Sequence, residues 1–230
     1  MGEMIEVKRP DGKTCPAYLA RPSAGGKAAA AGDKSHAVVV IQEWWGLNDQ
    51  IMKMADRYAQ AGYRALVPDL YRGKVASAAD EASHLMTHLN FPDAGTQDIR
   101  GCAQHLKTSG GKVGVLGFCM GGALTIIAGV HVPEVDAGVC FYGIPPKEAA
   151  DPAKMRVPFQ AHFANKDDWC TPAAVNALEA TLKGAGKKYE LYRYDAQHAF
   201  MNEARPEVYD AKAAKLAWER CLTFLAAHLR

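Results

Sequence analysis

The chain has 230 residues, a mass of 24.8 kDa, 49% hydrophobic residues and 23% charged residues. The length suits one α/β domain, and the composition excludes a disordered, collagen-like or coiled-coil chain. The formal net charge is only +2, which is too small for a protein that wraps nucleic acid through many phosphate contacts. The apolar runs are too short to span a bilayer, and residues 1–13 contain no apolar segment of a secretory signal.

The chain contains six cysteines, and no two of them have the two-residue spacing of a zinc knuckle or a redox dithiol. Without a secretory signal, a disulfide framework is not expected either. We therefore predict a cytoplasmic protein whose thiols are reduced, most of them small residues of the core. Cys119 is the exception, because its neighbours indicate chemistry.

Strand patterns recur along the whole chain. A hairpin is predicted first, with strands at 4–8 and 14–20, and the Gly- and Ala-rich residues 23–35 predict a flexible loop. The β-branched run at 37–41 predicts a strand buried on both faces, as in a parallel sheet. Further strands are predicted at 63–67, 112–117, 135–142, 157–164 and 188–194.

Helical spacing separates these strands. Helices are predicted between the cap Asn48 and the stop Gly62, at 78–90, 98–108, 121–130 and 173–183, and at the end with Trp218, Leu222, Leu225 and Leu229 on one stripe. This alternation predicts one α/β domain over residues 1–230, with a mostly parallel sheet and helices on both faces. Ligands bind at the carboxyl ends of such strands, here the loops 42–47, 69–77, 118–122, 165–172 and 195–202.

The sequence Gly117-Phe118-Cys119-Met120-Gly121 joins a predicted strand to a predicted helix. This is the pattern of a nucleophile elbow with Cys in place of Ser, and its sharp turn requires small flanking residues. Backbone amides and the helix dipole favour negative charge there, so we expect the pKa of Cys119 to be lowered towards a reactive thiolate. The alternative is a buried structural cysteine in a Gly-rich turn.

His198 follows a predicted strand and precedes the final helix, which is the place of the general base in α/β-hydrolases. The acid that orients it should lie between nucleophile and histidine, and Asp167 and Asp168 follow the strand at 157–164. Asp167 is favoured, and Asp168 is the alternative. The other seven histidines are expected on the surface or in the core, with His162 structural.

With these motifs, the chain resembles the dienelactone hydrolase family of the α/β-hydrolase superfamily. The resemblance is carried by residues 40–46 (VIQEWWG), 67–71 (VPDLY), 114–122 (GVLGFCMGG) and 198–200 (HAF), and it runs from about Tyr18 to the end. It implies a single-domain α/β-hydrolase that cleaves enol lactones and related esters. It also implies a Cys nucleophile and no metal or organic cofactor.

The resemblance also implies further site residues. Glu43 occupies the position of a glutamate that contacts the nucleophilic thiol and controls its ionisation, although a glutamate in a loop is otherwise a solvated side chain. The amides of Met120 and Trp44 match the two donors of the oxyanion hole. The aromatic side chains in these loops either line an apolar cavity or pack in the core: Trp44, Trp45, Tyr71, Phe118 and Trp169.

The substrate-carboxylate clamp of dienelactone-cleaving members is incomplete here. Asn202 stands four residues after His198 where those members carry an arginine, and Arg205 is the nearest one. The second clamp arginine corresponds to Gly73, with Arg72 one residue early. We therefore expect substrate binding by Arg72, Tyr71 and Asn202, with a weaker demand for a substrate carboxylate.

These residues predict a hydrolase that opens a small ester or lactone through an acyl-enzyme formed on Cys119. The alternatives are a thiol redox sensor, in which Cys170 would resolve an oxidised Cys119, and a binding module on a hydrolase scaffold. The expected partner is a small molecule, with no nucleic acid and no membrane. The expected state is a monomer or a weak homodimer.

Overall fold

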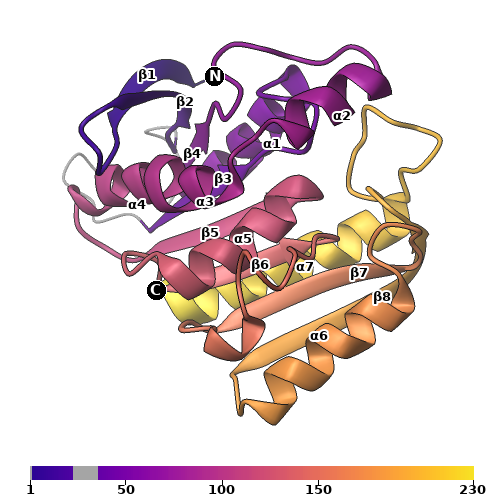
Figure 1. Ribbon diagram of the computed structural model, residues 1–230. Coiled ribbons are helices and arrows are strands. Elements are labelled where there is room, and N and C mark those ends of the chain that lie inside the picture. The colour runs from indigo at the N-terminus through magenta and orange to yellow at the C-terminus, as the bar shows by residue number, and fades with distance from the viewer. Residues whose placement is uncertain (1, 23–35) are drawn as a thin grey trace.

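The computed structural model describes residues 2–22 and 36–230, so the loop predicted at 23–35 lies outside the described residues. In the described part of the chain the strands form one eight-stranded sheet in the order β1-β2-β4-β3-β5-β6-β7-β8 (Figure 1). Only β1 with β2 and β2 with β4 pair antiparallel, which confirms the mostly parallel sheet. The strands are β1 (Glu3–Lys8), β2 (Thr14–Ala20), β3 (Ala37–Ile41), β4 (Arg64–Pro68), β5 (Val113–Phe118), β6 (Ala137–Phe141), β7 (Phe159–Lys166) and β8 (Tyr189–Gln197).

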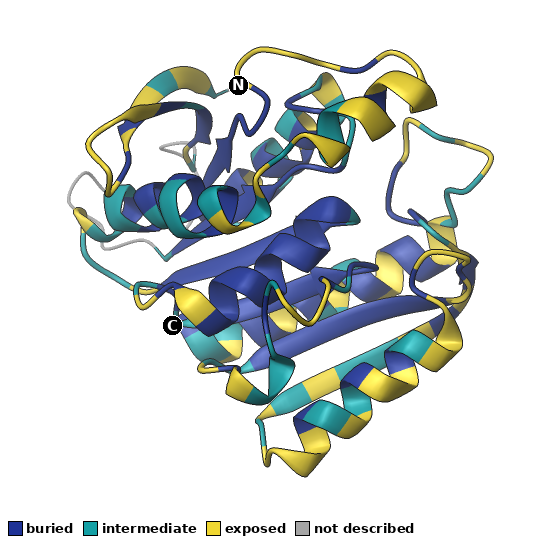
Figure 2. Cartoon of the chain, viewed as in Figure 1, coloured by how far each residue is buried: buried dark blue, intermediate teal, exposed yellow. Residues whose placement is uncertain are grey.

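Helices cover both faces of the sheet, because the central strands are apolar on both sides. Val38 and Val40 of β3 belong to the core shared with α1 (Asp49–Gln60) and α7 (Ala211–Leu229). Val39 and Ile41 belong to the core on the opposite face, under α4 (Arg100–Lys107), α5 (Met120–His131) and α6 (Pro172–Gly184). Figure 2 shows the central strands buried and the outer faces of α6 and β8 partly exposed.

The predicted helix at 98–108 is too short. The helical segment begins at Phe91, with α3 (Phe91–Asp93) and the π-helix η1 (Ala94–Ile99) leading into α4. The side chain of Asn90 caps it by accepting from the amide of Asp93 at 3.0 Å. Proline and glycine in this stretch indicate a loop, but a proline in the first turn removes no hydrogen bond of a helix.

Two other helices also differ from their predicted patterns. The helix predicted at 78–90 is α2, which spans only Ala79–Thr87 and has Ala82 as its one buried residue. In α7 the buried stripe includes Ala217, Cys221 and Phe224, whereas Trp218 and Leu222 are half-buried at its edge. The predicted stripe is thus confirmed at Leu225 and Leu229, which are buried, whereas in the first half of α7 the buried positions lie one residue earlier than predicted. The remaining helix is the short 3₁₀ segment η2 (Pro152–Lys154).

Candidate active site

Cys119 lies in the sharp turn between β5 and α5, at the carboxyl edge of the sheet. Its backbone has φ 54° and ψ −115°, a conformation that costs a non-glycine residue about 1–3 kcal/mol. The turn is held by the bond from the Cys119 amide to the Phe141 carbonyl, at 3.0 Å. A Cβ atom on Gly117 would collide with the Gly121 carbonyl, and one on Gly121 with the Ile41 carbonyl, so both positions require glycine.

The structure brings His198 and Asp167 together. His198 directly follows β8, and its Nδ1 lies 2.8 Å from Oδ2 of Asp167, whose side chain is fully buried. The other oxygen of Asp167 accepts from the amides of Trp169 and Cys170, both at 2.8 Å. Asp168 is exposed, and so the hydrogen-bond partner of His198 is the first of the two adjacent aspartates.

The pKa values of this pair follow from their contact. Burial alone would lower the pKa of His198, but the hydrogen bond to Asp167 and the interaction with the Cys119 thiol outweigh it and raise the pKa above its ordinary value, which makes the imidazole a stronger proton acceptor for that thiol. Burial pushes the pKa of Asp167 up, but the bond to His198 and the two amides hold it below its ordinary value. Nε2 of His198 is buried and has no hydrogen-bond partner among the described residues.

The Cys119 thiol has a raised pKa, which corrects the expectation of a lowered one. Burial is the largest cause, and the nearby carboxyl group of Glu43 adds to it. The interaction with His198 and a hydrogen bond from the Met120 amide act in the opposite direction but do not prevail. Burial and Glu43 therefore oppose ionisation of the thiol, although it stands at the N-terminus of α5.

Glu43 is a buried carboxyl group with two partners. Its Oε1 accepts from the Tyr142 hydroxyl at 3.2 Å and its Oε2 from the Asn202 side-chain amide at 2.6 Å. Burial raises its pKa, against the effect of these hydrogen bonds and of the charge on His198. The interpretation of Glu43 as a solvated loop side chain is therefore wrong, since only 4% of the residue is exposed.

The cavity at Cys119 has two lobes that share Cys119, His198, Met86 and Trp169. The polar lobe, about 60 Å³, is otherwise lined by Glu43, Trp44, Trp45, Ala199 and Arg205. The apolar lobe, about 160 Å³, is otherwise lined by Phe91, Met120, Ala123, Tyr142, Gly143, Ile144, Pro146 and Cys170. Trp169 is 64% exposed at the rim.

Of the five aromatic side chains predicted either to line the cavity or to pack in the core, three line it: Trp44, Trp45 and Trp169. Tyr71 and Phe118 are not in its wall. Trp44 packs edge-on against Trp45 and Trp169, with ring centroids 5.3 and 5.6 Å apart. Phe118 stacks on Phe141 in the core at 4.7 Å. The hydroxyl of Tyr71 donates to Sδ of Met120 at 3.2 Å, which places it behind the residue that follows the nucleophile.

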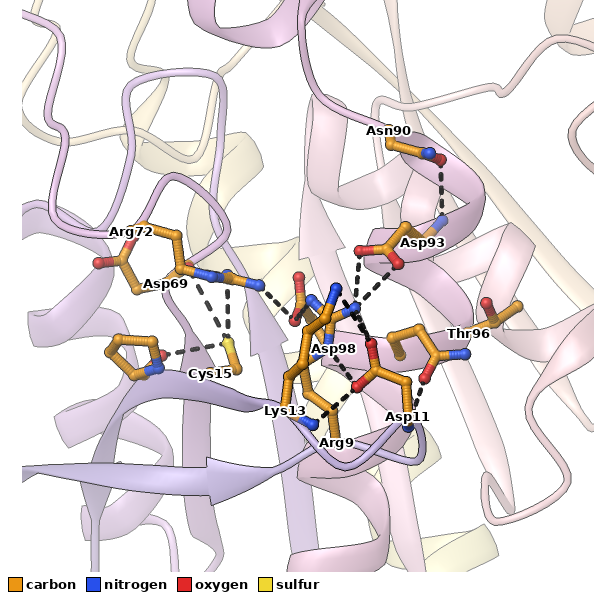
Figure 3. A network of polar contacts seen from close by, with 12 residues as sticks. Arg9, Asp11, Lys13, Cys15, Asp69, Arg72, Asn90, Asp93, Thr96 and Asp98 are labelled. Atoms are coloured by element: carbon orange, nitrogen blue, oxygen red, sulfur yellow. Dashed lines mark hydrogen bonds and ion pairs between the residues drawn. The ribbon is translucent and has the colours of Figure 1, made fainter.

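Arg72 points away from the cavity. Its guanidinium donates to Oδ1 of Asp98 at 2.7 Å and to the Asp69 carbonyl at 2.6 Å. Figure 3 shows it in a network that also contains Arg9, whose Nη1 donates to the same Asp98 oxygen at 3.0 Å. Asp98 is almost fully buried, and two arginines compensate its charge. The expectation that Arg72 binds substrate is therefore not met by this geometry.

The family model for dienelactone hydrolases matches residues 16–229, nearly the whole chain. The chain belongs to the dienelactone hydrolase family. It is 35% identical to Protein usf of Aquifex pyrophilus over 241 residues, and 32% identical over 244 residues to an Aquifex aeolicus protein named "Putative carboxymethylenebutenolidase". Each of these alignments covers all of both chains.

A solved structure from Klebsiella pneumoniae, titled "Putative Dienelactone Hydrolase", has a TM-score of 0.82 to this chain at 26% identity, with 98% of each chain covered. The fold is thus that of an α/β-hydrolase, and the resemblance drawn from the motifs is confirmed. This dienelactone hydrolase family member is a hydrolase that acts on ester or lactone bonds.

Two side chains of this family member, Tyr142 and Asn202, lie at Glu43 where the sequence patterns do not indicate them. Tyr142 follows β6, has φ 40°, bonds Glu43 and lies edge-on to the His198 ring with centroids 5.1 Å apart. Its position at the carboxyl end of a strand is the signal that would have found it. Asn202 was expected to bind substrate, but it is buried and holds Glu43 instead.

In residues 2–22 and 36–230, no helix is long and apolar enough to cross a membrane. The same part of the chain contains no group of three or more His, Cys, Asp and Glu residues placed to hold a metal ion.

Proposed function

We propose that this hydrolase cleaves a small ester or lactone with Cys119 as nucleophile, His198 as general base and Asp167 as the group that orients His198. The observation that carries the proposal is the arrangement of the imidazole. Nδ1 is bonded to buried Asp167, whereas Nε2 has no hydrogen-bond partner among the described residues and interacts with the neighbouring Cys119 thiol. A general base requires a nitrogen available to the nucleophile in this way.

Acylation begins when Sγ of Cys119 attacks the carbonyl carbon and the thiol proton passes to Nε2 of His198. The new C–S bond pushes the carbonyl electron pair onto oxygen, where the amides of Met120 and Trp44 donate to it. The bond to the leaving oxygen then breaks, and His198 returns the proton to that oxygen. In a lactone, the alcohol formed stays attached to the acyl chain.

Deacylation repeats these steps with water. The water oxygen attacks the thioester carbonyl and gives a proton to Nε2, and the C–S bond then breaks. The departing sulfur of Cys119 takes the proton back from His198, and the carboxylic acid leaves.

Glu43 is proposed to control the ionisation of the thiol. Its carboxyl group raises the pKa of Cys119 and is itself held by Asn202 and Tyr142. A thiol kept neutral by these groups is less exposed to oxidation and alkylation, because the thiolate is the reactive form. Substrate attack then requires proton transfer to His198 at the moment the C–S bond forms.

The redox alternative is less well supported. Burial raises the pKa of the Cys170 thiol, and the charge of Asp167 raises it further, so Cys170 is a poor attacking thiolate for an oxidised Cys119. The remaining parts of the proposal are a cytoplasmic location, a small-molecule substrate without nucleic acid or membrane as partner, and a monomer or weak homodimer.

Steady-state hydrolysis of p-nitrophenyl acetate by wild type, Cys119→Ala and Cys170→Ala tests the proposal. We expect continuous turnover by wild type, loss of turnover in Cys119→Ala, and continuous turnover, at whatever rate, in Cys170→Ala. A single stoichiometric burst from wild type would favour the redox sensor. Equal rates in wild type and Cys119→Ala would contradict the assignment of the nucleophile.

A further inference from the structure

We propose that the apolar lobe binds an apolar group of the substrate about as large as a phenyl ring, and that Ile144 sets the size limit. The inference rests on the proposed ester hydrolysis and adds the substrate class: an ester or lactone with an apolar substituent of about six carbons. Three observations carry it, namely the chemistry of the lobe wall, its volume, and the way in which Ile144 is held.

The wall of the apolar lobe is mostly apolar. None of its described lining residues is Asp, Glu, Lys or Arg, and Phe91, Met120 and Ile144 present apolar side chains. The basic side chain in this wall, His198, is already paired with Asp167, so a carboxylate placed deeper in the lobe would lose its hydration without gaining a free ionic partner, which is costly. An apolar group gains free energy by leaving water for the same space.

The volume of the lobe limits the size of that group. A dry cavity of about 150 Å³ lined by apolar side chains is large enough to hold benzene. The apolar lobe has a volume of about 160 Å³ and directly adjoins Cys119 and His198. One ring, or a chain of similar volume, therefore fills it while the scissile carbonyl stays at the thiol.

Ile144 is held in place by the core beneath it. It lies in the loop after β6, and its half-buried side chain packs against the core under α4, α5 and α6. Cys170, in the loop after β7 that also carries Asp167, lines the same lobe and is buried. Because Ile144 packs against this dense core, its side chain has little room to move aside for a larger group.

The test compares kcat/KM for two ester series that place the variable chain on either side of the scissile bond. One series is p-nitrophenyl esters from acetate to decanoate, and the other is acetate esters of alcohols from methanol to decanol. The enzymes are wild type, Ile144→Phe and the control Leu216→Phe, which adds the same ring to an exposed position of α7.

In wild type we expect kcat/KM to rise in one series by up to about fourfold per methylene, and to level off near six carbons. In that series, the kcat/KM of the ester with a six-carbon variable chain is divided by that of the ester with the shortest chain. Ile144→Phe should lower this ratio at least tenfold, whereas Leu216→Phe should leave it as in wild type. A chain-length profile that is flat in both series, or one that is unchanged in Ile144→Phe, would overturn the inference.

A binding measurement separates this inference from the proposed function. The ¹⁹F resonance of fluorobenzene should broaden with wild type and with Leu216→Phe, and broaden much less with Ile144→Phe. If no ester is turned over but fluorobenzene behaves in this way, the proposed function fails and the lobe remains a binding site. If esters are turned over but fluorobenzene does not broaden with wild type, the inference fails alone.

Discussion

Asp167 uses both of its carboxylate oxygens in the site. One accepts from Nδ1 of His198 at 2.8 Å, and the other accepts from the amides of Trp169 and Cys170. The two amides fix the carboxylate, and the carboxylate fixes the tautomer and the direction of the imidazole. Nε2 is thereby presented to the side of the ring where Cys119 stands.

Replacing Asp167 by Asn should lower kcat for p-nitrophenyl acetate by about 10²–10⁴-fold, because the amide favours the wrong tautomer of His198. Asp168→Asn is the matched control, since Asp168 is exposed and is expected to leave kcat within about twofold of wild type. Steady-state rates and far-UV circular dichroism of both variants make the comparison. A larger loss in Asp168→Asn would transfer the orienting role to that residue.

Arg205 should carry the preference for a charged substrate. It lines the polar lobe, stacks over Trp45 at 5.6 Å and pairs with exposed Glu207 at 2.7 Å. Its partial exposure limits the gain from a substrate carboxylate to about 1 kcal/mol, or a few-fold in KM. Arg205→Ala should therefore raise KM a few-fold for an ester with a free carboxylate and change KM little for its neutral analogue.

Arg72→Ala is the control for this charge preference. Because Arg72 bonds Asp98 instead of facing the cavity, its removal should leave the ratio of the two KM values unchanged. Urea unfolding should show a loss of about 1–3 kcal/mol, since of the two arginines that pair with buried Asp98 among the described residues, Arg9 alone remains. If the ratio of the two KM values changed in Arg72→Ala and not in Arg205→Ala, Arg72 and not Arg205 would be the residue that binds the substrate carboxylate.

Cys119 should be the first thiol labelled by iodoacetamide, because it is half-buried while the other five are buried. Glu43→Gln should accelerate that labelling near pH 7, since removal of the carboxyl group removes one cause of the raised pKa of Cys119. Peptide mass mapping after brief labelling measures both effects. Slower labelling of Cys119 in Glu43→Gln than in wild type would refute the role given to Glu43.

His162 should make the protein less stable in acid. Burial lowers its pKa to about 3, whereas in the unfolded chain it titrates near 6.5. The unfolded state therefore binds the extra proton first, and the free energy of unfolding falls as pH drops from 6.5 towards 3. At pH 4.5 this amounts to about 2–3 kcal/mol.

The comparison for His162 is His162→Gln, which lacks the titrating group. Between pH 7 and pH 4.5 its free energy of unfolding should fall by about 2 kcal/mol less than that of wild type. Equal losses in the two proteins, measured by urea unfolding at both pH values, would show that His162 does not remain neutral in the fold. The bonds of its ring to Tyr194 and Gln160 explain why the neutral form is favoured.

Local sequence patterns predicted much of this fold. The buried run at 37–41 is β3 to the residue, Asn48 caps α1 as expected, and the glycines beside Cys119 mark its turn. These features depend on neighbours in the chain and on burial of whole faces. The order of Cys119, Asp167 and His198 along the strands was readable for the same reason.

Local sequence patterns do not predict the direction of a side chain whose partner is distant in the sequence. Arg72 turns towards Asp98, 26 positions away, and Asn202 towards Glu43, 159 positions away. The thiol pKa was misjudged because burial depends on the assembled site, whereas the helix N-terminus is a local feature. The lobes of the cavity likewise exist only where several loops meet.

The most direct test of the account is to find the acyl group during turnover. Wild-type enzyme mixed with p-nitrophenyl butyrate is quenched in acid within the first turnovers, digested and analysed by mass spectrometry. The account predicts a butyryl group on the peptide that contains Cys119, formed together with the first equivalent of p-nitrophenol. A butyryl group on another residue, or steady turnover with no covalent adduct in wild type at any quench time, would contradict it.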